Sequence, residues 1–282
     1  MRRNLFLFTL IGLLFFLGNG MSLAETTAFN SGLAIVEDIT QDENGLIILD
    51  GLFSITDLEK FPGVDNFKVY SRWTGIGTHT IKIQIADSDD NIIADSDEVN
   101  LEFKKDYETY YQVFDFNNTV FPKPGIYWVD ALLDDKRDFS MPLFIQSNDK
   151  DITFRNPPES PVLAFSLPAL DVKENDNKLQ VVSGVFEYFI FDRFPAAYDF
   201  IIANAWYSGD GKYTQYIELL DPEGNIIYKS NPQQFENRIK AINVVYDKLE
   251  DIIFPNAGRY ILKVYLDGKL VFGYPILVTE QQ

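Results

Sequence analysis

Residues 258–278 read GRYILKVYLDGKLVFGYPILV, and residues 125–145, which lie 133 positions earlier, read GIYWVDALLDDKRDFSMPLFI. Before the central turn of each stretch every second residue is apolar, which is the period of a strand with one buried face. The turn Asp267-Gly268 is among the strongest short signals for a β-hairpin. The sequence therefore predicts two antiparallel strands joined by a tight turn, and it predicts them twice.

The recurrence extends from Asn44 to Pro142, with one extra residue in the second copy near Gly211. The first-copy residues that recur include Asn44, Gly51, Phe53, Phe61, Pro62, Phe67, Trp73, Gly77, Asp87, Asn91, Phe121, Pro122 and Tyr127. Solenoid units are only about 20 to 50 residues long, so a repeat of this length is a whole domain. The chain is expected to hold two copies of one fold.

The N-terminus has the features of a secretory signal peptide. Arg2 and Arg3 precede an apolar run from Leu5 to Leu17, and the small residues before Glu25 suit a signal peptidase. We expect cleavage after residue 24, and an uncleaved membrane anchor is the alternative. The remaining chain divides into a first domain (25–146), a proline-containing linker (147–161) and a second domain (162–282).

Several short strands with turns between them are predicted in each copy. About seven or eight per copy, separated by turn residues, favour an all-β fold of two tandem antiparallel β-sandwiches. Residues 235–249 approach helical spacing, but their counterpart around Tyr110 is rich in strand formers, so both regions are predicted as strands.

This layout resembles the immunoglobulin-like and fibronectin-III-like sandwiches. Trp73 and Trp206 fall on the third strand of each copy, and Tyr127 and Tyr260 lead into the penultimate strand, where such domains carry a core Trp and a corner Tyr. The cysteine pair of antibody domains is absent. The pattern is also similar to bacterial sandwich domains of uncharacterised function. The resemblance implies an accessory, adhesive or assembly module.

Composition excludes some partners and chemistries. The chain has no cysteine, which excludes disulfides and thiolate metal sites. Its formal net charge of −18 would become −20 without Arg2 and Arg3. Nucleic acid is therefore an unsuitable ligand, because phosphate binding relies on Lys and Arg. The charge favours solubility, divalent cations or a basic partner.

An acidic stretch in the first copy is a candidate calcium site. Hard oxygen donors within a dozen residues could meet across a hairpin and hold Ca²⁺ at about 2.3–2.6 Å. The candidate ligands are Asp87, Asp89, Asn91, Asp95 and Asp97. The spacing departs from the EF-hand loop, and the matching turn that begins at Asp221 has fewer acids. A solvated hairpin tip is the alternative.

The aromatic residues, 15% of the chain, should mostly fill two cores. Neighbours along a strand cannot all point inward, however. Trp128 stands between Tyr127 and Val129, and Tyr207 follows Trp206. We therefore expect Trp128 and Tyr207 to be exposed contacts for a ligand.

Enzymatic activity is not expected. The sole histidine, His79, has no accompanying nucleophile motif and is expected at the surface of a strand entry. A glycosidase would need two carboxyl groups about 5–10 Å apart across a cleft, and it remains the enzyme alternative. No cofactor signature is present.

We therefore expect an exported, periplasmic or extracellular protein that binds a protein or polysaccharide partner in the cell envelope or at the surface. The interdomain groove and outward aromatics are the expected contact surface. A carbohydrate-binding accessory module and a calcium-dependent adhesive module are the alternatives.

Overall fold

The computed structural model describes residues 28–147 and 158–281, without the side chains of residues 105–107. The predicted signal peptide and residues 148–157 of the predicted linker lie outside the described residues. Within the described ranges every regular element is a strand. Repeat 1 contains β1 (Ala28–Gln41), β2 (Ile47–Leu52), β3 (Ile55–Leu58), β4 (Gly63–Asp87), β5 (Ile92–Asp95), β6 (Val99–Phe121), β7 (Gly125–Leu133) and β8 (Lys136–Ser147).

Repeat 2 has the same strands, with more interruptions. They are β9 (Val162–Ala169), β10 (Asp171–Glu174), β11 (Gln180–Val185), β12 (Tyr188–Phe191), β13 (Ala196–Tyr207), β14 (Gly211–Leu220), β15 (Ile226–Lys229), β16 (Gln233–Asn237), β17 (Ile242–Phe254), β18 (Gly258–Leu266) and β19 (Lys269–Glu280). The region with ambiguous periodicity, 235–249, is therefore strand with a short break, as predicted.

Repeat 1 has two layers because one long strand, β4, crosses between them, and in repeat 2 the same path is divided between β13 and β14. The first part of β4 pairs with β1, and its last part pairs with β7. The register shifts between Gly75 and Gly77, and Gly77 has a φ of 88° that side chains disfavour. The crossing makes an inner sheet, β2-β1-β4-β6, and an outer sheet, β5-β4-β7-β8-β3.

Repeat 2 makes the same inner sheet from β9, β10, β11, β13 and β17. Its outer sheet is β15-β14-β18-β19-β12, and β16 also pairs with β14. One feature departs from the predicted antiparallel sandwich. In each repeat a short strand joins the outer sheet in parallel, β3 beside β8 and β12 beside β19. The fold is thus all-β with mixed outer sheets.

Local details repeat with the sequence. The hairpin turn predicted at Asp267-Gly268 joins Leu266 to Lys269, and both turn residues have positive φ. The hydroxyl of Tyr260 donates to the carbonyl of Asn256 at 2.9 Å. In repeat 1 the hydroxyl of Tyr127 makes the same bond to Lys123 at 2.8 Å. Each predicted corner tyrosine therefore fastens the loop before its strand.

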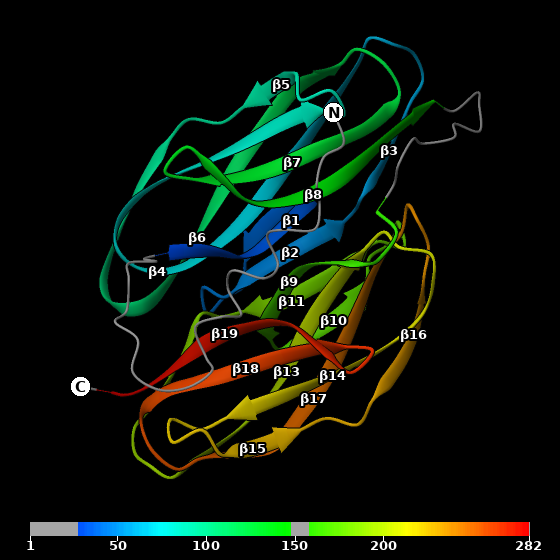
Figure 1. Ribbon diagram of the computed structural model, residues 1–282. Helices are drawn as coiled ribbons and strands as arrows, with labels where there is room; N and C mark the ends of the chain where they lie inside the picture. The colour runs from blue at the N-terminus through cyan, green and yellow to red at the C-terminus, as the bar shows by residue number, and fades with distance from the viewer. Residues whose placement is uncertain (1–27, 148–157, 282) are drawn as a thin grey trace.

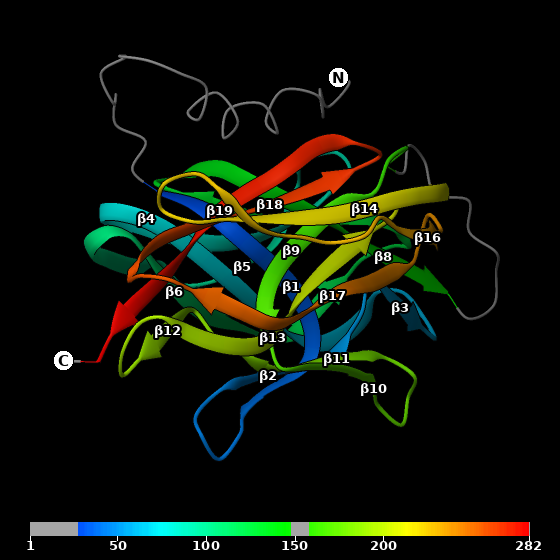
Figure 2. The same cartoon turned by 90° about the horizontal axis from the view of Figure 1, so that it is seen from below.

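The repeats are joined edge to edge through equivalent strands. Strand β2 pairs antiparallel with β11, its counterpart 133 residues later, and Leu49 faces Val182. Gly32 on β1 faces Phe165 on β9, again at a spacing of 133. These self-equivalent pairs place a quasi-two-fold axis between the repeats. Figure 1 shows repeat 1 above repeat 2 with β2, β9 and β11 between them, and Figure 2 shows the β1–β2 and β10–β11 hairpins projecting at one edge.

The hydrophobic core continues from one repeat into the other. The largest cluster of buried residues includes Trp73 and Val129 of repeat 1 together with Leu167, Ala203 and Tyr207 of repeat 2. A second cluster, around Trp206, belongs mostly to repeat 2. The sequence favoured two domains with separate cores, whereas the structure shows that a large apolar surface is shared. In each repeat this shared surface covers the face of the inner sheet that points away from the outer sheet of the same repeat.

Candidate functional site

The acidic hairpin of repeat 1 is organised by backbone hydrogen bonds. Oδ1 of Asp87 accepts from the amide nitrogens of Asp89 at 2.9 Å and Asn91 at 3.0 Å. The side-chain nitrogen of Asn91 also donates to Asp87, at 3.1 Å. These bonds lower the pKa of Asp87 against a burial effect that would raise it. The carboxylate therefore closes the turn.

The other predicted calcium ligands point elsewhere. Asp95 forms an ion pair with Lys82 at 2.7 Å, and Asp89 is 73% exposed beside Lys123. Ser96 separates Asp95 from Asp97 and donates to the carbonyl oxygen of Asp97. In the described ranges, no three acidic or histidine side chains come together as a metal site. The structure does not bring the five predicted ligands together.

The same turn recurs in repeat 2 with fewer acids. Oδ1 of Asp221 accepts from the amide nitrogen of Asn225 at 2.7 Å, and Oδ2 accepts from its side chain at 2.9 Å. An Asp that bonds to the backbone of its own turn is a common device of tight turns. The shared spacing of Asp and Asn in the two copies therefore reflects turn geometry.

Trp128 is buried, so its prediction as an exposed contact was wrong. Its side chain is 7% exposed and packs with Ile126, Phe144 and Ile239. Ile239 belongs to the loop between β16 and β17 of repeat 2, which covers the outer sheet of repeat 1. The hydroxyl of Ser54 anchors this loop by donating to the carbonyl of Lys240 at 2.8 Å.

Tyr207 is also buried, with no exposed surface, and its prediction as a contact was wrong. Alternation does turn Tyr207 away from the core around Trp206, as expected. Repeat 1 covers that face, however, and the hydroxyl of Tyr207 lies 3.4 Å from the carbonyl oxygen of Phe53. Burial raises the pKa of Tyr207 far above its usual value.

His79 is structural. The prediction of a surface histidine was wrong, because its side chain is 8% exposed. Nδ1 lies 2.8 Å from Oδ2 of Asp134, and Nε2 lies 3.0 Å from the carbonyl oxygen of Ile76. The two ring nitrogens thus contact a carboxylate and a backbone carbonyl, and neither contact is to a hydroxyl group.

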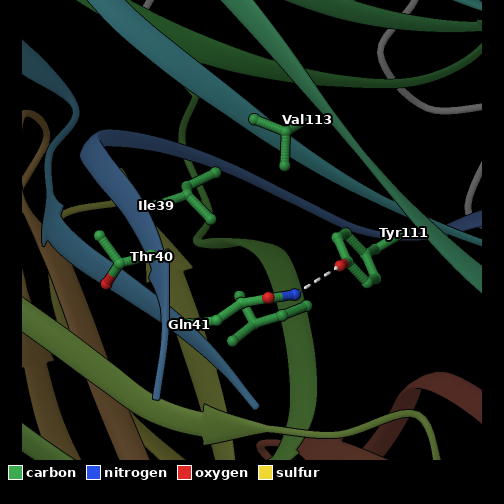
Figure 3. Close-up of a pocket in the computed structure, with 6 residues that line it drawn as sticks. Ile39, Thr40, Gln41, Tyr111 and Val113 are labelled. Atoms are coloured by element: carbon green, nitrogen blue, oxygen red, sulfur yellow. Dashed lines mark hydrogen bonds between the residues drawn. The ribbon is translucent and has the colours of Figure 1, made fainter. Parts of the chain in front are cut away.

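An open groove of about 400 Å³ lies in repeat 1 between the β1–β2 hairpin and β6. Its lining consists of Ile39, Thr40, Gln41, Ile47, Tyr111 and Val113. Figure 3 shows Tyr111 and Val113 of β6 on one side, opposite Ile39 and Gln41 of the hairpin. A groove of this volume can accommodate a small ligand or part of a chain.

The groove has an aromatic wall with a polar rim. The side-chain nitrogen of Gln41 donates to the hydroxyl of Tyr111 at 3.3 Å. The ring of Tyr111 stacks on that of Tyr70, with centroids 5.9 Å apart. Tyr70 is fully buried, so Tyr111 rests against the rigid interface between the repeats.

The lining of the groove combines apolar and hydrogen-bonding side chains. Aliphatic side chains supply apolar contact, and a hydroxyl, an amide and a phenol supply hydrogen bonds. The lining contains no carboxylate, histidine, lysine or cysteine that would serve as an acid, base or nucleophile.

This groove was not predicted from the sequence. Tyr111 directly follows Tyr110, and because two neighbours on a strand cannot both point inward, this spacing is the signal that could have marked it. Ile39 and Gln41 come from a different strand, and no local pattern connects them with Tyr111. In repeat 2 the matching positions of Gln41 and Tyr111 are Glu174 and Val244, so the lining is not repeated.

The architecture defines a tandem-repeat, all-β protein whose two halves share a sheet. The family of unknown function DUF6941 matches residues 33–146 and again residues 166–279. The chain belongs to this family and carries its domain twice, at the offset of 133 residues read from the sequence. No curated protein matches the chain.

Two solved structures are similar at low identity. A biofilm-associated protein BSP domain shares 12% identity over 83% of this chain and 30% of its own, with a TM-score of 0.22. A glycosyl hydrolase family 2 member from Bacteroides cellulosilyticus shares 10% identity over 89% of this chain and 35% of its own, with a TM-score of 0.27. The chain spans about a third of their length, and at these TM-scores the likenesses carry no argument. Among the described residues, no helix could span a membrane.

Proposed function

We propose that the protein is an exported, non-enzymatic binding protein of the cell envelope or surface, and that the groove beside Tyr111 holds its partner. The observation that carries this proposal is the groove itself, whose lining supplies contact area and hydrogen bonds without reactive groups. The sequence supports export through the features of residues 1–24.

A protein segment is the partner that this groove suits best. The groove is open, and Ile39, Ile47 and Val113 offer aliphatic contacts for an apolar side chain. Gln41 and Tyr111 lie at its rim, where they can bond to a peptide backbone. The acidic net charge favours a basic partner over an acidic one.

A polysaccharide is the second candidate, and one contact favours it. An aromatic ring held next to a side-chain amide, as in Tyr111 and Gln41, provides an apolar face and a hydrogen-bonding group side by side. Sugar rings need both. Direct titration with polysaccharides distinguishes the two partners.

Affinity capture from the organism's own envelope extract tests the proposal. Tyr111→Ala should lose the captured partner, and Tyr111→Phe should retain most of it, because the ring remains. Tyr188→Ala is the matched control, since Tyr188 is 53% exposed in the other repeat. Equal capture by wild type and Tyr111→Ala would show that the groove is not the binding site.

Two further measurements address the rest of the proposal. Titration with envelope polysaccharides, followed by calorimetry, should give no heat if the partner is a protein and a Tyr111-dependent heat if it is a glycan. Release of reducing sugar from any of these polymers would contradict the non-enzymatic assignment. Fractionation of cells should place the protein outside the cytoplasm.

A further inference from the structure

The surface between the repeats is quasi-symmetric in backbone but not in side chains. A strict two-fold pairing would put the same residue on both sides of the axis. Here several positions near the axis have different residues in the two repeats. The differences are complementary, so they favour the pairing of repeat 1 with repeat 2 over the pairing of two like repeats.

The first difference lies on the axis. Gly32 of repeat 1 and Phe165 of repeat 2 occupy equivalent positions and face each other directly. A Cβ built on Gly32 would lie 3.2 Å from Cβ of Phe165, which is tighter than ordinary contact. A side chain on Gly32 would therefore require Phe165 to shift by a few tenths of an ångström, so two phenylalanines would crowd this place. Two glycines would leave the space of a benzyl group unfilled.

The second difference is a buried ion pair. Nε of Arg72 lies 2.6 Å from Oε2 of Glu187, and Arg72 has no exposed surface. The residues at the matching positions are Ala205 for Arg72 and Ser54 for Glu187. A pair of second repeats would therefore bury Glu187 against alanine, and a pair of first repeats would bury Arg72 against serine. Each leaves a charge without its partner, which is strongly unfavourable.

Size differs between the repeats at one further position, and a second contact surrounds Arg72. Tyr70 donates its hydroxyl to Oε1 of Glu187 at 3.1 Å, and the position that matches Tyr70 is Ala203. The guanidinium of Arg72 lies 4.9 Å from the ring centre of Tyr274. At positions 70 and 72 the large side chain thus belongs to repeat 1, and repeat 2 has alanine at both matching positions. At the axis the order is reversed, with Gly32 in repeat 1 and Phe165 in repeat 2.

We propose that the inner-sheet face of repeat 1 is a recognition surface specific for a domain of the second type, and that it rejects its own kind. The partner it fits is a DUF6941 domain with an acid at position 187, small residues at 203 and 205, and a large apolar residue at 165. The pairing does not require the linker. Repeat 2 of a second copy of this chain can supply the same partner.

Cutting the linker in the folded protein tests this directly. A protease site inserted within residues 148–157 allows cleavage of the purified, folded chain. The two fragments should co-elute on size exclusion with the mass of the uncut chain, and native mass spectrometry should show one of each. Fragments that separate without denaturant would overturn the proposal.

Selectivity needs a second measurement. The cleaved protein is mixed with an isotope-labelled cleaved copy, partly unfolded in urea and refolded by dilution. Labelled and unlabelled fragments should exchange, yet every complex should contain one repeat 1 and one repeat 2. Pairs of like fragments would overturn the proposal.

The axis position offers a compensating pair of variants. Gly32→Phe in the cleaved protein should weaken association at least tenfold, and adding Phe165→Gly should restore it. Gly125→Phe is the matched control, because nothing lies within 4 Å of a Cβ placed there. Failure of the double variant to recover would reject the axis pair as a determinant. If the variants do not fold, the composition of the refolded wild-type complexes still tests the proposal.

Discussion

Arg72 of repeat 1 and Glu187 of repeat 2 form an ion pair that crosses the boundary between the repeats, with 2.6 Å between Nε and Oε2. Burial by itself would lower the pKa of Arg72, but the Glu187 carboxylate outweighs it and the pKa of the guanidinium is raised. The hydroxyl of Ser31 accepts a further bond from Arg72 at 3.2 Å. The ion pair crosses the boundary and ties the repeats to one alignment.

Breaking this pair from one side should destabilise the protein strongly. Glu187→Ala leaves the Arg72 guanidinium buried without a counter-charge, which costs about 3–5 kcal/mol. Urea unfolding followed by tryptophan fluorescence measures this loss. Asp95→Ala, which removes the exposed partner of Lys82, is the control and should change the midpoint little. Equal effects of the two variants would show that the buried pair has no special role.

Trp128 should contribute to stability and not to ligand contact. Trp128→Ala removes a buried ring that packs against the loop carrying Ile239, and we expect a loss of about 3–5 kcal/mol. Ile239→Ala should cause part of the same loss, because the two side chains are in one cluster. Double-mutant analysis should show coupling between them. Additive losses would mean that the loop does not cover the tryptophan.

Asp247 should make stability depend on pH. Its carboxylate is 2% exposed and accepts bonds from Gln233 at 2.7 Å and Gln215 at 3.2 Å. Burial raises its pKa above 3.8, against the smaller opposing effect of these bonds. The folded state therefore holds the proton more tightly than the unfolded state, and the free energy of unfolding falls as pH rises above about 3.8 through the folded pKa.

The comparison with Asp247→Asn isolates this contribution. Below about pH 3.8 the raised pKa contributes no penalty, and above the folded-state pKa the penalty is complete. The stability of the wild type should therefore fall relative to that of the D247N variant between these limits. Urea titrations at a series of pH values measure the difference. A constant difference across this range would contradict the assignment.

The two β-hairpin turns offer a matched pair of substitutions. Asp135 has a φ of 62° at the position where repeat 2 has Gly268, with a φ of 76°. Glycine adopts this conformation without the steric cost of a side chain, so Asp135→Gly should stabilise the protein by about 0.5–1 kcal/mol. The reverse change, Gly268→Asp, should destabilise it by a similar amount. Thermal melting of both variants measures the shifts, and a shift of the same sign in both would refute this account.

Asp87 should stabilise the fold whether or not calcium is present. Asp87→Ala leaves the amide groups of Asp89 and Asn91 without their acceptor, which costs about 1–2 kcal/mol. The melting temperature of wild type should be the same in calcium and in chelator. A midpoint that rises with calcium and loses this rise in Asp87→Ala would restore the calcium site.

Local patterns were sufficient for much of the fold. The strands at 258–278 and the Asp267-Gly268 turn follow from alternation and turn chemistry, which act between residues near in sequence. The corner bonds of Tyr127 and Tyr260 follow for the same reason. The ambiguous stretch at 235–249 was assigned correctly because its copy around Tyr110 had a clearer strand pattern.

The candidate contacts failed because alternation tells which sheet face a side chain occupies but not what covers that face. Trp128 and Tyr207 do point away from the cores of their own repeats. Repeat 2 packs over Trp128 through Ile239, and repeat 1 packs over Tyr207 through the backbone of Phe53. The groove was missed because Gln41 and Tyr111 come from strands far apart in the chain.

The sequence by itself determined that one strand-built domain occurs twice, because a repeat at a constant offset needs no knowledge of space. It also determined the turns and the alternation of each strand. Only the tertiary structure decided that β2 pairs with its own copy β11, and that Gly32 and Arg72 meet Phe165 and Glu187. Those contacts depend on the complementarity of two distant surfaces, and no local period or spacing records which surfaces will meet.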